Sequence, residues 1–215
     1  MQQRCVDALR SEDWVDDEVL LYLLRNILTQ RLFPHASVLI VDSIVLTLLI
    51  DSPDLAARNK KRPATSVEVT LRQCTADFAA ALEGDSLLLL PLHCKGHWSL
   101  LVYRPSWSQW YCFDSMGTYH RARVEACLEA LDRLKLVPAT EETRVYFYDD
   151  MPRQPQSFEC ARYVLFYAFV LLKNYTDGEM REDARGFVRR LEREIPRVCE
   201  ANRPAFEQQL LNVMG

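Results

Sequence analysis

The chain has 215 residues, of which 49% are hydrophobic and 26% are charged, which is enough for one compact domain with a sizeable core. Its net charge of −4 argues against nucleic-acid binding, because neutralising phosphates requires clustered lysine and arginine side chains. No run approaches the roughly 18 apolar residues of a membrane span, and the amino-terminal segment lacks the apolar centre of a signal peptide. We therefore expect one domain over residues 1–215, monomeric and without a membrane partner.

The seven cysteines are scattered without CxxC spacing. This pattern fits neither a disulfide framework nor a zinc site. We therefore expect a reducing compartment, no bound metal and no cofactor.

The amino-terminal part of the chain predicts mainly helices. Residues 16–31 have helical periodicity behind an acidic start, which suits the positive end of a helix dipole. Residues 36–50 predict either a short strand that runs into a helix, which we prefer, or one buried helix. Residues 66–84 predict a helix that ends at Gly84.

Three apolar runs then follow one another closely and predict neighbouring strands, because of their length, their aromatic content and a turn-like connection. They span residues 86–92, 97–104 and 109–115.

The carboxyl-terminal part returns to helices. A helix over 121–136 and a strand over 143–150 precede an apolar segment from about 159 to 173, which is long enough for a buried helix. Two amphipathic helices follow, over about 179–193 and 195–213. This order predicts an α+β fold, with a mixed sheet flanked by helices that come mostly from the two ends of the chain.

Three residues with catalytic chemistry lie at the ends of these predicted elements. His97 opens one strand, Asp114 closes the next, and Cys160 begins the apolar helix. Antiparallel pairing of the two strands would bring His97 and Asp114 to the same edge of the sheet. A cysteine at a helix amino terminus and beside a histidine has a favoured thiolate, and an aspartate that binds the imidazole fixes its tautomer. The three residues therefore predict a nucleophilic thiol site.

The segment before Cys160 offers a donor for a developing oxyanion. Gln154 or Gln156 could supply a side-chain amide, and Pro155 favours an extended backbone at Gln154. The backbone N–H of Cys160 would be the second donor.

Each of these residues also has a purely structural interpretation. A histidine at a strand start is commonly hydrogen-bonded, a cysteine in an apolar helix is commonly buried and inert, and Asp-Ser after a strand is commonly a turn. We give that interpretation to Cys112 and Cys127. Only the joint pattern favours a catalytic site.

The joint pattern resembles the ubiquitin-like-protein-specific cysteine proteases, the Ulp/sentrin-specific protease family with the adenain-like, papain-like fold. The resemblance lies in His-Trp at 97–98, Asp-Ser at 114–115, and a glutamine six residues before Cys160. "GHWSLLVY" is especially similar to the deneddylase branch, and "SEDWVDDEVLLYLL" is similar to the family's "WLND" segment, with Trp14 and Asp17 on the matching positions.

The resemblance implies specific roles for these residues. His97 would be the general base, Asp114 its orienting partner, Cys160 the nucleophile and Gln154 the oxyanion donor. The resemblance also implies that a ubiquitin-like modifier (SUMO, ubiquitin or the neddylation modifier) and its conjugates are the partners. The substrate-binding residues would be Asp17 and the pair Trp14 and Trp98, whose two indoles would enclose a tunnel that accepts only a Gly-Gly tail.

One departure from the family concerns the neighbours of the nucleophile. The family usually has Asp-Cys-Gly, whereas this chain has Glu159, Cys160 and Ala161. The methyl of Ala161 adds bulk beside the nucleophile. A modifier-binding protein with impaired catalysis is therefore one alternative, and an effector-type acetyltransferase with the same order of residues is the other.

We expect a cytoplasmic location, with the nucleus or, for a delivered effector, a host cytosol as alternatives.

Overall fold

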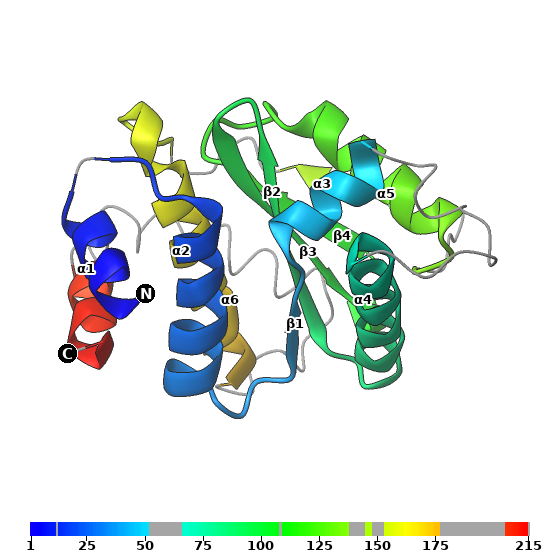
Figure 1. Ribbon diagram of the computed structural model, residues 1–215, viewed down its shortest axis with the longest axis horizontal. Coiled ribbons are helices and arrows are strands. Elements are labelled where there is room, and N and C mark those ends of the chain that lie inside the picture. The colour runs from blue at the N-terminus through cyan, green and yellow to red at the C-terminus, as the bar shows by residue number, and fades with distance from the viewer. Residues whose placement is uncertain are drawn as a thin grey trace.

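The computed structural model describes residues 1–11, 13–51, 66–107, 109–137, 145–147, 153–176 and 205–214, with the backbone alone at 66–68 and 71. A five-stranded sheet lies between groups of helices (Figure 1). This confirms the predicted α+β fold with a mixed sheet flanked by helices. Among the described helices, none has the length and apolarity to cross a membrane.

The sheet combines parallel and antiparallel pairs. Its strand order is β1-β2-β3-β4-β5, with the central strands antiparallel and each edge strand parallel to its neighbour. The strands are β1 (Val38–Ile40), β2 (Leu87–Cys94), β3 (His97–Arg104), β4 (Gln109–Phe113) and β5 (Val145–Phe147). The predicted strands are thus confirmed where they are described, although β2 continues two residues further and β4 ends two residues earlier than expected.

The helices cover both faces of the sheet. The described helices are α1 (Gln2–Arg10), α2 (Asp17–Tyr22), the π-helix η1 (Leu23–Leu32), α3 (Ser43–Asp51), α4 (Ser66–Glu83), the 3₁₀ helices η3 (Pro105–Trp107) and η4 (Ser157–Glu159), α5 (Arg121–Arg133), α6 (Cys160–Thr176) and a helix over 205–214.

Most of the predicted helices are confirmed. Residues 16–31 form α2, which continues directly into η1, and residues 36–50 contain β1 followed by α3. The helix α4 ends directly before Gly84. The helix α1 has no counterpart among the predictions. The predicted helix over 179–193 and the first part of 195–213 lie outside the described residues.

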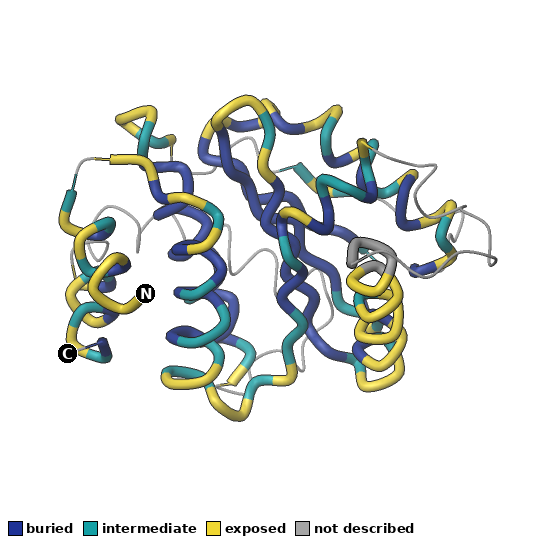
Figure 2. The backbone as a smooth tube through the Cα atoms, in the orientation of Figure 1, coloured by how far each residue is buried: buried dark blue, intermediate teal, exposed yellow. Residues whose placement is uncertain are grey.

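Alternate residues of the central strands enter two separate apolar layers. Leu100 and Val102 of β3 belong to a cluster with α1, α2, η1, α6 and the 205–214 helix, whereas Leu101 and Tyr103 belong to a cluster with α3, α4 and α5. This follows because successive strand side chains point to opposite faces. The ends of the chain therefore cover one face, as predicted, while the middle of the chain covers the other. The central strands are buried as a result (Figure 2).

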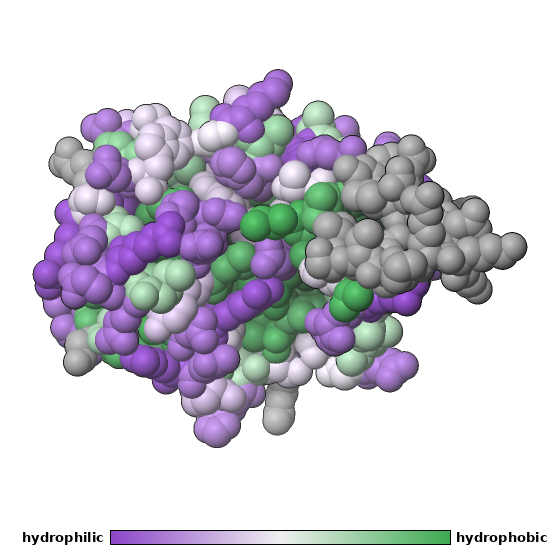
Figure 3. Space-filling model, viewed as in Figure 1, coloured by the Kyte–Doolittle hydropathy of each residue, from purple (hydrophilic) through white to green (hydrophobic). Residues whose placement is uncertain are grey.

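A groove of about 360 Å³ follows the edge strand β1 between η1 and α4. Figure 3 shows apolar side chains gathered at the centre of this face with hydrophilic side chains around them. Leu39 and Val41 contribute to its lining, together with Arg25 and Asp77. Burial raises the pKa of Cys74 on the same wall to about 11, so this thiol is a poor nucleophile near pH 7.

Candidate active site

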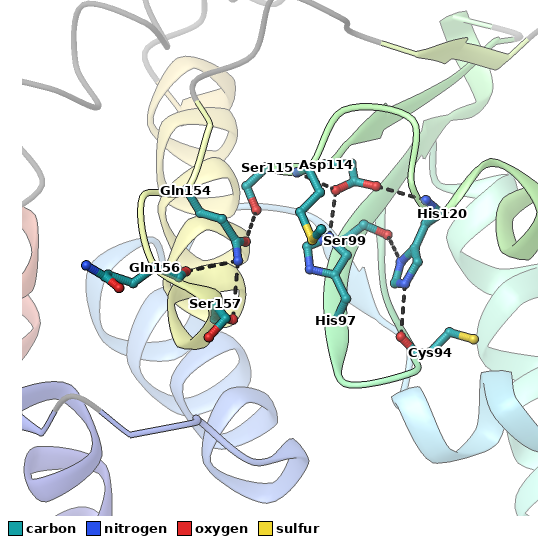
Figure 4. Close-up of polar contacts among 10 residues, drawn as sticks. Cys94, His97, Ser99, Asp114, Ser115, His120, Gln154, Gln156 and Ser157 are labelled. Atoms are coloured by element: carbon teal, nitrogen blue, oxygen red, sulfur yellow. Dashed lines mark hydrogen bonds and ion pairs between the residues drawn. The ribbon is translucent and has the colours of Figure 1, made fainter.

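The tight β2–β3 hairpin and the end of β4 bring His97 and Asp114 together. Lys95 and Gly96 form the turn with φ of 50° and 73°, so that His97 pairs across from Cys94. His97 Nε2 lies 2.6 Å from Asp114 Oδ1 (Figure 4). Both side chains are buried. The predicted meeting of these two residues at one edge of the sheet is confirmed by the antiparallel pairing of β3 and β4.

Three N–H groups hold the Asp114 carboxylate. Besides His97, the backbone N–H of Met116 donates to Oδ1 at 2.8 Å and the backbone N–H of His120 donates to Oδ2 at 3.0 Å. Gly117, with φ of 79°, allows the turn that places these groups. Burial alone would raise the pKa of Asp114, but the hydrogen bonds from His97, Met116 and His120 lower it below its ordinary value. The carboxylate is therefore ionised near pH 7.

Cys160 is the first residue of α6 and is fully buried. Its thiol interacts with His97, and this interaction raises the pKa of the imidazole. Because Nε2 of His97 is engaged with Asp114, Nδ1 is the nitrogen available to the thiol. Burial alone would lower the pKa of His97, but the bond to Asp114 and the interaction with Cys160 outweigh it and raise the pKa to about 9. His97, Asp114 and Cys160 therefore form one connected group.

A reciprocal pair of hydrogen bonds fixes the turn that leads to the nucleophile. The side chain of Gln156 accepts from the backbone N–H of Glu159, and the Glu159 carboxylate accepts from the backbone N–H of Gln156 at 3.2 Å. Ala161 follows in the first turn of α6 and is buried in the apolar cluster with the sheet. Its methyl group therefore contributes to the core.

Gln154 lies beside this site, but its amide is bound to its own loop. The hydroxyl of Ser115 donates to Gln154 Oε1 at 2.6 Å, while Gln154 Nε2 donates to the carbonyls of Gln156 and Ser157 at 3.0 and 3.2 Å (Figure 4). Both amide protons thus have partners. Donation to an oxyanion requires one of these bonds to be exchanged, and this role of Gln154 stays a prediction.

The predicted substrate-binding residues border one cleft. Trp14, Asp17 and Trp98 line a hollow of about 500 Å³. Trp98 is buried and packs on His93 with ring centroids 4.6 Å apart, whereas Trp14 is 53% exposed. Trp14 also borders a second hollow, of about 490 Å³, which is lined by His97 among others. The exposed indole of Trp14 therefore lies between the cleft and the catalytic group.

His120 belongs to the same group and was missed by sequence reasoning. Its Nδ1 lies 2.7 Å from Ser99 Oγ, its Nε2 lies 3.3 Å from the Cys94 carbonyl oxygen, and its ring meets that of His97 edge-on at 4.8 Å between centroids. Burial and the charge of His97 lower the pKa of His120 to about 4. The only sequence signal was a histidine six residues after Asp114, at the start of a helix.

His97, Asp114 and His120 are also close enough together to be tested as metal ligands, with one ligand atom from each within 4.8 Å of the others. Their atoms already have partners, however: His97 bonds to Asp114, and both ring nitrogens of His120 are engaged. The donor set therefore fits a hydrogen-bonded network.

Other cysteines in the core have unreactive surroundings. Cys112 and Cys127 are buried, and burial raises the pKa of Cys127 to about 12 and raises that of Cys112 as well. Neither thiol ionises near pH 7, which agrees with the structural interpretation of both residues.

Three solved structures have a similar fold. The catalytic domain of the Chaetomium thermophilum Ulp1-like SUMO protease matches with a TM-score of 0.53 and 22% identity, over 74% of this chain and 62% of that one. The Ulp1 protease domain in complex with Smt3, the yeast ortholog of SUMO, matches with a TM-score of 0.58 and 14% identity, over 80% of this chain and 71% of that one. The central domain of Lpg1148 from Legionella pneumophila matches with a TM-score of 0.53 and 13% identity, over 94% and 98%. At these identities the likeness is one of fold, and the chain spans less than two thirds of the Chaetomium domain.

The sequence itself was compared in two further ways. No match was found among curated proteins. The model of the Ulp1 protease family, C-terminal catalytic domain, matches residues 13–203, which include His97, Asp114 and Cys160. The special similarity to the deneddylase branch stays a prediction. The match over most of the chain, together with the shared fold and the buried cysteine–histidine–aspartate group, shows that this chain belongs to the Ulp1 protease family of cysteine peptidases.

Proposed function

We propose that this chain cleaves the bond after the carboxyl-terminal Gly-Gly of a ubiquitin-like modifier, to process the modifier or to release it from its conjugates. The observation that carries the proposal is the buried bond of 2.6 Å between His97 and Asp114, with Cys160 interacting with the same imidazole. This is the arrangement that a thiol nucleophile requires.

The chemistry follows from the positions of these atoms. Cys160 Sγ, as thiolate, attacks the carbonyl carbon of the terminal glycine, and the carbonyl oxygen becomes an oxyanion. The C–N bond then breaks, the protonated His97 gives its proton to the leaving amine, and a thioester to Cys160 is left. His97 next takes a proton from water, whose oxygen attacks the thioester, and the thiolate leaves. Asp114 stabilises the imidazolium before the amine leaves and again during the attack by water.

The lining of the cleft supports a substrate whose carboxyl-terminal tail consists of glycines, which have no side chains. Trp14 and Trp98 border the same hollow, and two aromatic faces restrict what passes between them to a slender chain. Asp17, at the start of α2 and on the same cleft, supplies a negative charge to a basic group of the modifier. Solved SUMO proteases share this fold, which supports SUMO-like modifiers as the class of substrate.

The burial of Ala161 argues for an active enzyme over a binder with impaired catalysis. Its methyl group lies in the apolar cluster behind the nucleophile, where it adds packing without narrowing the hollow lined by Trp14 and His97. The alternative of an acetyltransferase gains no support from a cleft lined by two tryptophans.

The test is covalent labelling. The chain is incubated with SUMO, ubiquitin and the neddylation modifier, each carrying a carboxyl-terminal thiol-reactive group, and adducts are detected by mass. We expect an adduct that is lost in Cys160→Ala and kept in Cys94→Ala, the matched control for a partly exposed thiol near the site. The modifier that reacts fastest identifies the substrate. Absence of an adduct with all three modifiers, or labelling of Cys94, would overturn the proposal.

A further inference from the structure

His120 makes four contacts that together connect the catalytic group to the β2–β3 hairpin. Its backbone N–H donates to Asp114, its ring packs edge-on against His97, and its two ring nitrogens bond to Ser99 and to the carbonyl of Cys94. The residue is 2% exposed. It is thus positioned on all sides by the elements that form the site.

The partners of the ring determine its tautomer. The Cys94 carbonyl can only accept, so Nε2 of His120 must carry the proton and donate to it. Nδ1 then has a lone pair, and the Ser99 hydroxyl donates to it at 2.7 Å. These two bonds hold the ring in one orientation. Burial and the charge of His97 lower the pKa of His120 to about 4, so the ring is neutral near pH 7.

The surroundings of His120 also favour the neutral ring. The groups that face it are His97, Asp114, His93 and Tyr119, of which His97 carries a positive charge in the active state and Asp114 a negative one. A second positive ring at 4.8 Å would oppose the charge on His97. The neutral ring fills the space beside His97 without that repulsion.

We propose that His120 is a positioning residue of the catalytic centre, an uncharged histidine that holds Asp114 and the ring of His97 in line. This inference rests on the proposed function for its kinetic readout. The ring bonds of His120 fix its backbone, its backbone N–H fixes Asp114 Oδ2, and Asp114 Oδ1 fixes His97. Ser99, which touches none of the three catalytic side chains in the described contacts, acts on them only through this chain of bonds.

The experiment compares four variants. Ser99→Ala removes the donor to Nδ1, His120→Leu removes both ring bonds, and His120→Gln restores an amide N–H toward the Cys94 carbonyl. Ser86→Ala is the matched control, because its hydroxyl bonds to Ser37 at 2.7 Å at the opposite end of β2. Steady-state kinetics over pH give kcat, KM and the alkaline limb of kcat/KM, and denaturant unfolding gives the stability of each variant.

A positioning role predicts a specific pattern of results. Ser99→Ala and His120→Leu lower kcat by about 10-fold with KM nearly unchanged, because misplaced catalytic groups slow the chemical step rather than binding. Their alkaline limb moves to lower pH, because a poorly held Asp114 stabilises the His97 imidazolium less. His120→Gln recovers part of kcat and part of the shift of the alkaline limb. Ser86→Ala changes neither kcat nor the position of that limb.

Two outcomes would count against the inference. If Ser99→Ala and His120→Leu lose stability like Ser86→Ala but keep kcat and the alkaline limb, the role of His120 is structural only. A histidine-ring NMR titration of the free protein gives a second readout that needs no substrate. His97 should lose its proton at lower pH in Ser99→Ala than in wild type, and an unchanged titration would overturn the inference even if the enzyme proved inactive.

Discussion

Asp114 binds the imidazole of His97 through Oδ1 and the backbone N–H of His120 through Oδ2, so that one carboxylate joins the two histidines. His97 and Asp114 are 17 residues apart in the chain and 2.6 Å apart in space. The carboxylate therefore has no freedom to turn, and the orientation of His97 depends on it.

We expect Asp114→Asn to lower kcat/KM by two to four orders of magnitude (about 10²- to 10⁴-fold), because an amide cannot stabilise the imidazolium and favours the wrong tautomer. Cleavage of a modifier with a fluorogenic carboxyl-terminal group measures this loss. The control is Asp77→Asn on the exposed side of α4, where the carboxylate accepts from Gln73. Retained activity in Asp114→Asn, or an equal loss in the control, would show that this pair does not orient the base.

The raised pKa of His97 predicts the alkaline limit of activity. The proposed mechanism needs a protonated His97 to give a proton to the leaving amine, and this proton is lost as the pH rises through about 9, so kcat/KM should fall there. In Asp114→Asn the limb should move to lower pH, because one of the bonds that raise the pKa is gone. The pH profiles of kcat/KM for the wild type and for Asp114→Asn measure the two alkaline limbs. An alkaline limb near pH 6.5 in the wild type would contradict the bonding described for His97.

Gln154→Ala should lower kcat by about 10²- to 10³-fold with little change in KM, since an oxyanion donor acts in the transition state. Ser115→Ala, which removes only the donor to Gln154 Oε1, should cost less and leave the amide freer to turn toward the substrate. Single-turnover rates of thioester formation measure the effect of each variant. If Gln154→Ala acts as mildly as Gln73→Ala on the exposed face of α4, Gln154 only braces its loop.

The two tryptophans should respond differently to alanine. Trp14 is 53% exposed, so Trp14→Ala should weaken modifier binding without much loss of stability. Trp98 is 4% exposed and packs on His93, so Trp98→Ala should destabilise the fold by about 3–5 kcal/mol as well. Calorimetric binding to the Cys160→Ala protein and denaturant unfolding measure the two effects. Unchanged affinity in Trp14→Ala would remove this indole from the substrate site.

Ala161→Gly tests whether the departure from the family's Asp-Cys-Gly matters. Because Ala161 is buried in the first turn of α6, glycine should destabilise the protein by about 1 kcal/mol through lost helix propensity and packing. We expect no gain in kcat. A large increase in kcat for Ala161→Gly, measured with the same fluorogenic substrate, would mean that the methyl group obstructs the site.

The length, the aromatic content and the turn-like connection of the runs over 97–104 and 109–115 predicted the central strands, and periodicity predicted most of the helices, because both are local properties of the sequence. The helix α1 escaped prediction because it has only nine residues, of which Cys5 and Leu9 are the buried ones, and two such positions are too few to establish a helical period. The burial of the second face by α3, α4 and α5 also escaped prediction, because the chain order of helices does not say which face each one covers.

The residue types at the strand ends and at the helix start predicted His97, Asp114 and Cys160 as one catalytic group, because their chemistry is only useful in combination and their order resembles that of a known family. Only the tertiary structure brought in His120, since a lone histidine before a helix has no pattern that distinguishes it from a surface residue. The fold also decided that Gln154 binds its own loop and that Ala161 faces the core, because hydrogen-bond partners and burial depend on neighbours that lie far along the chain.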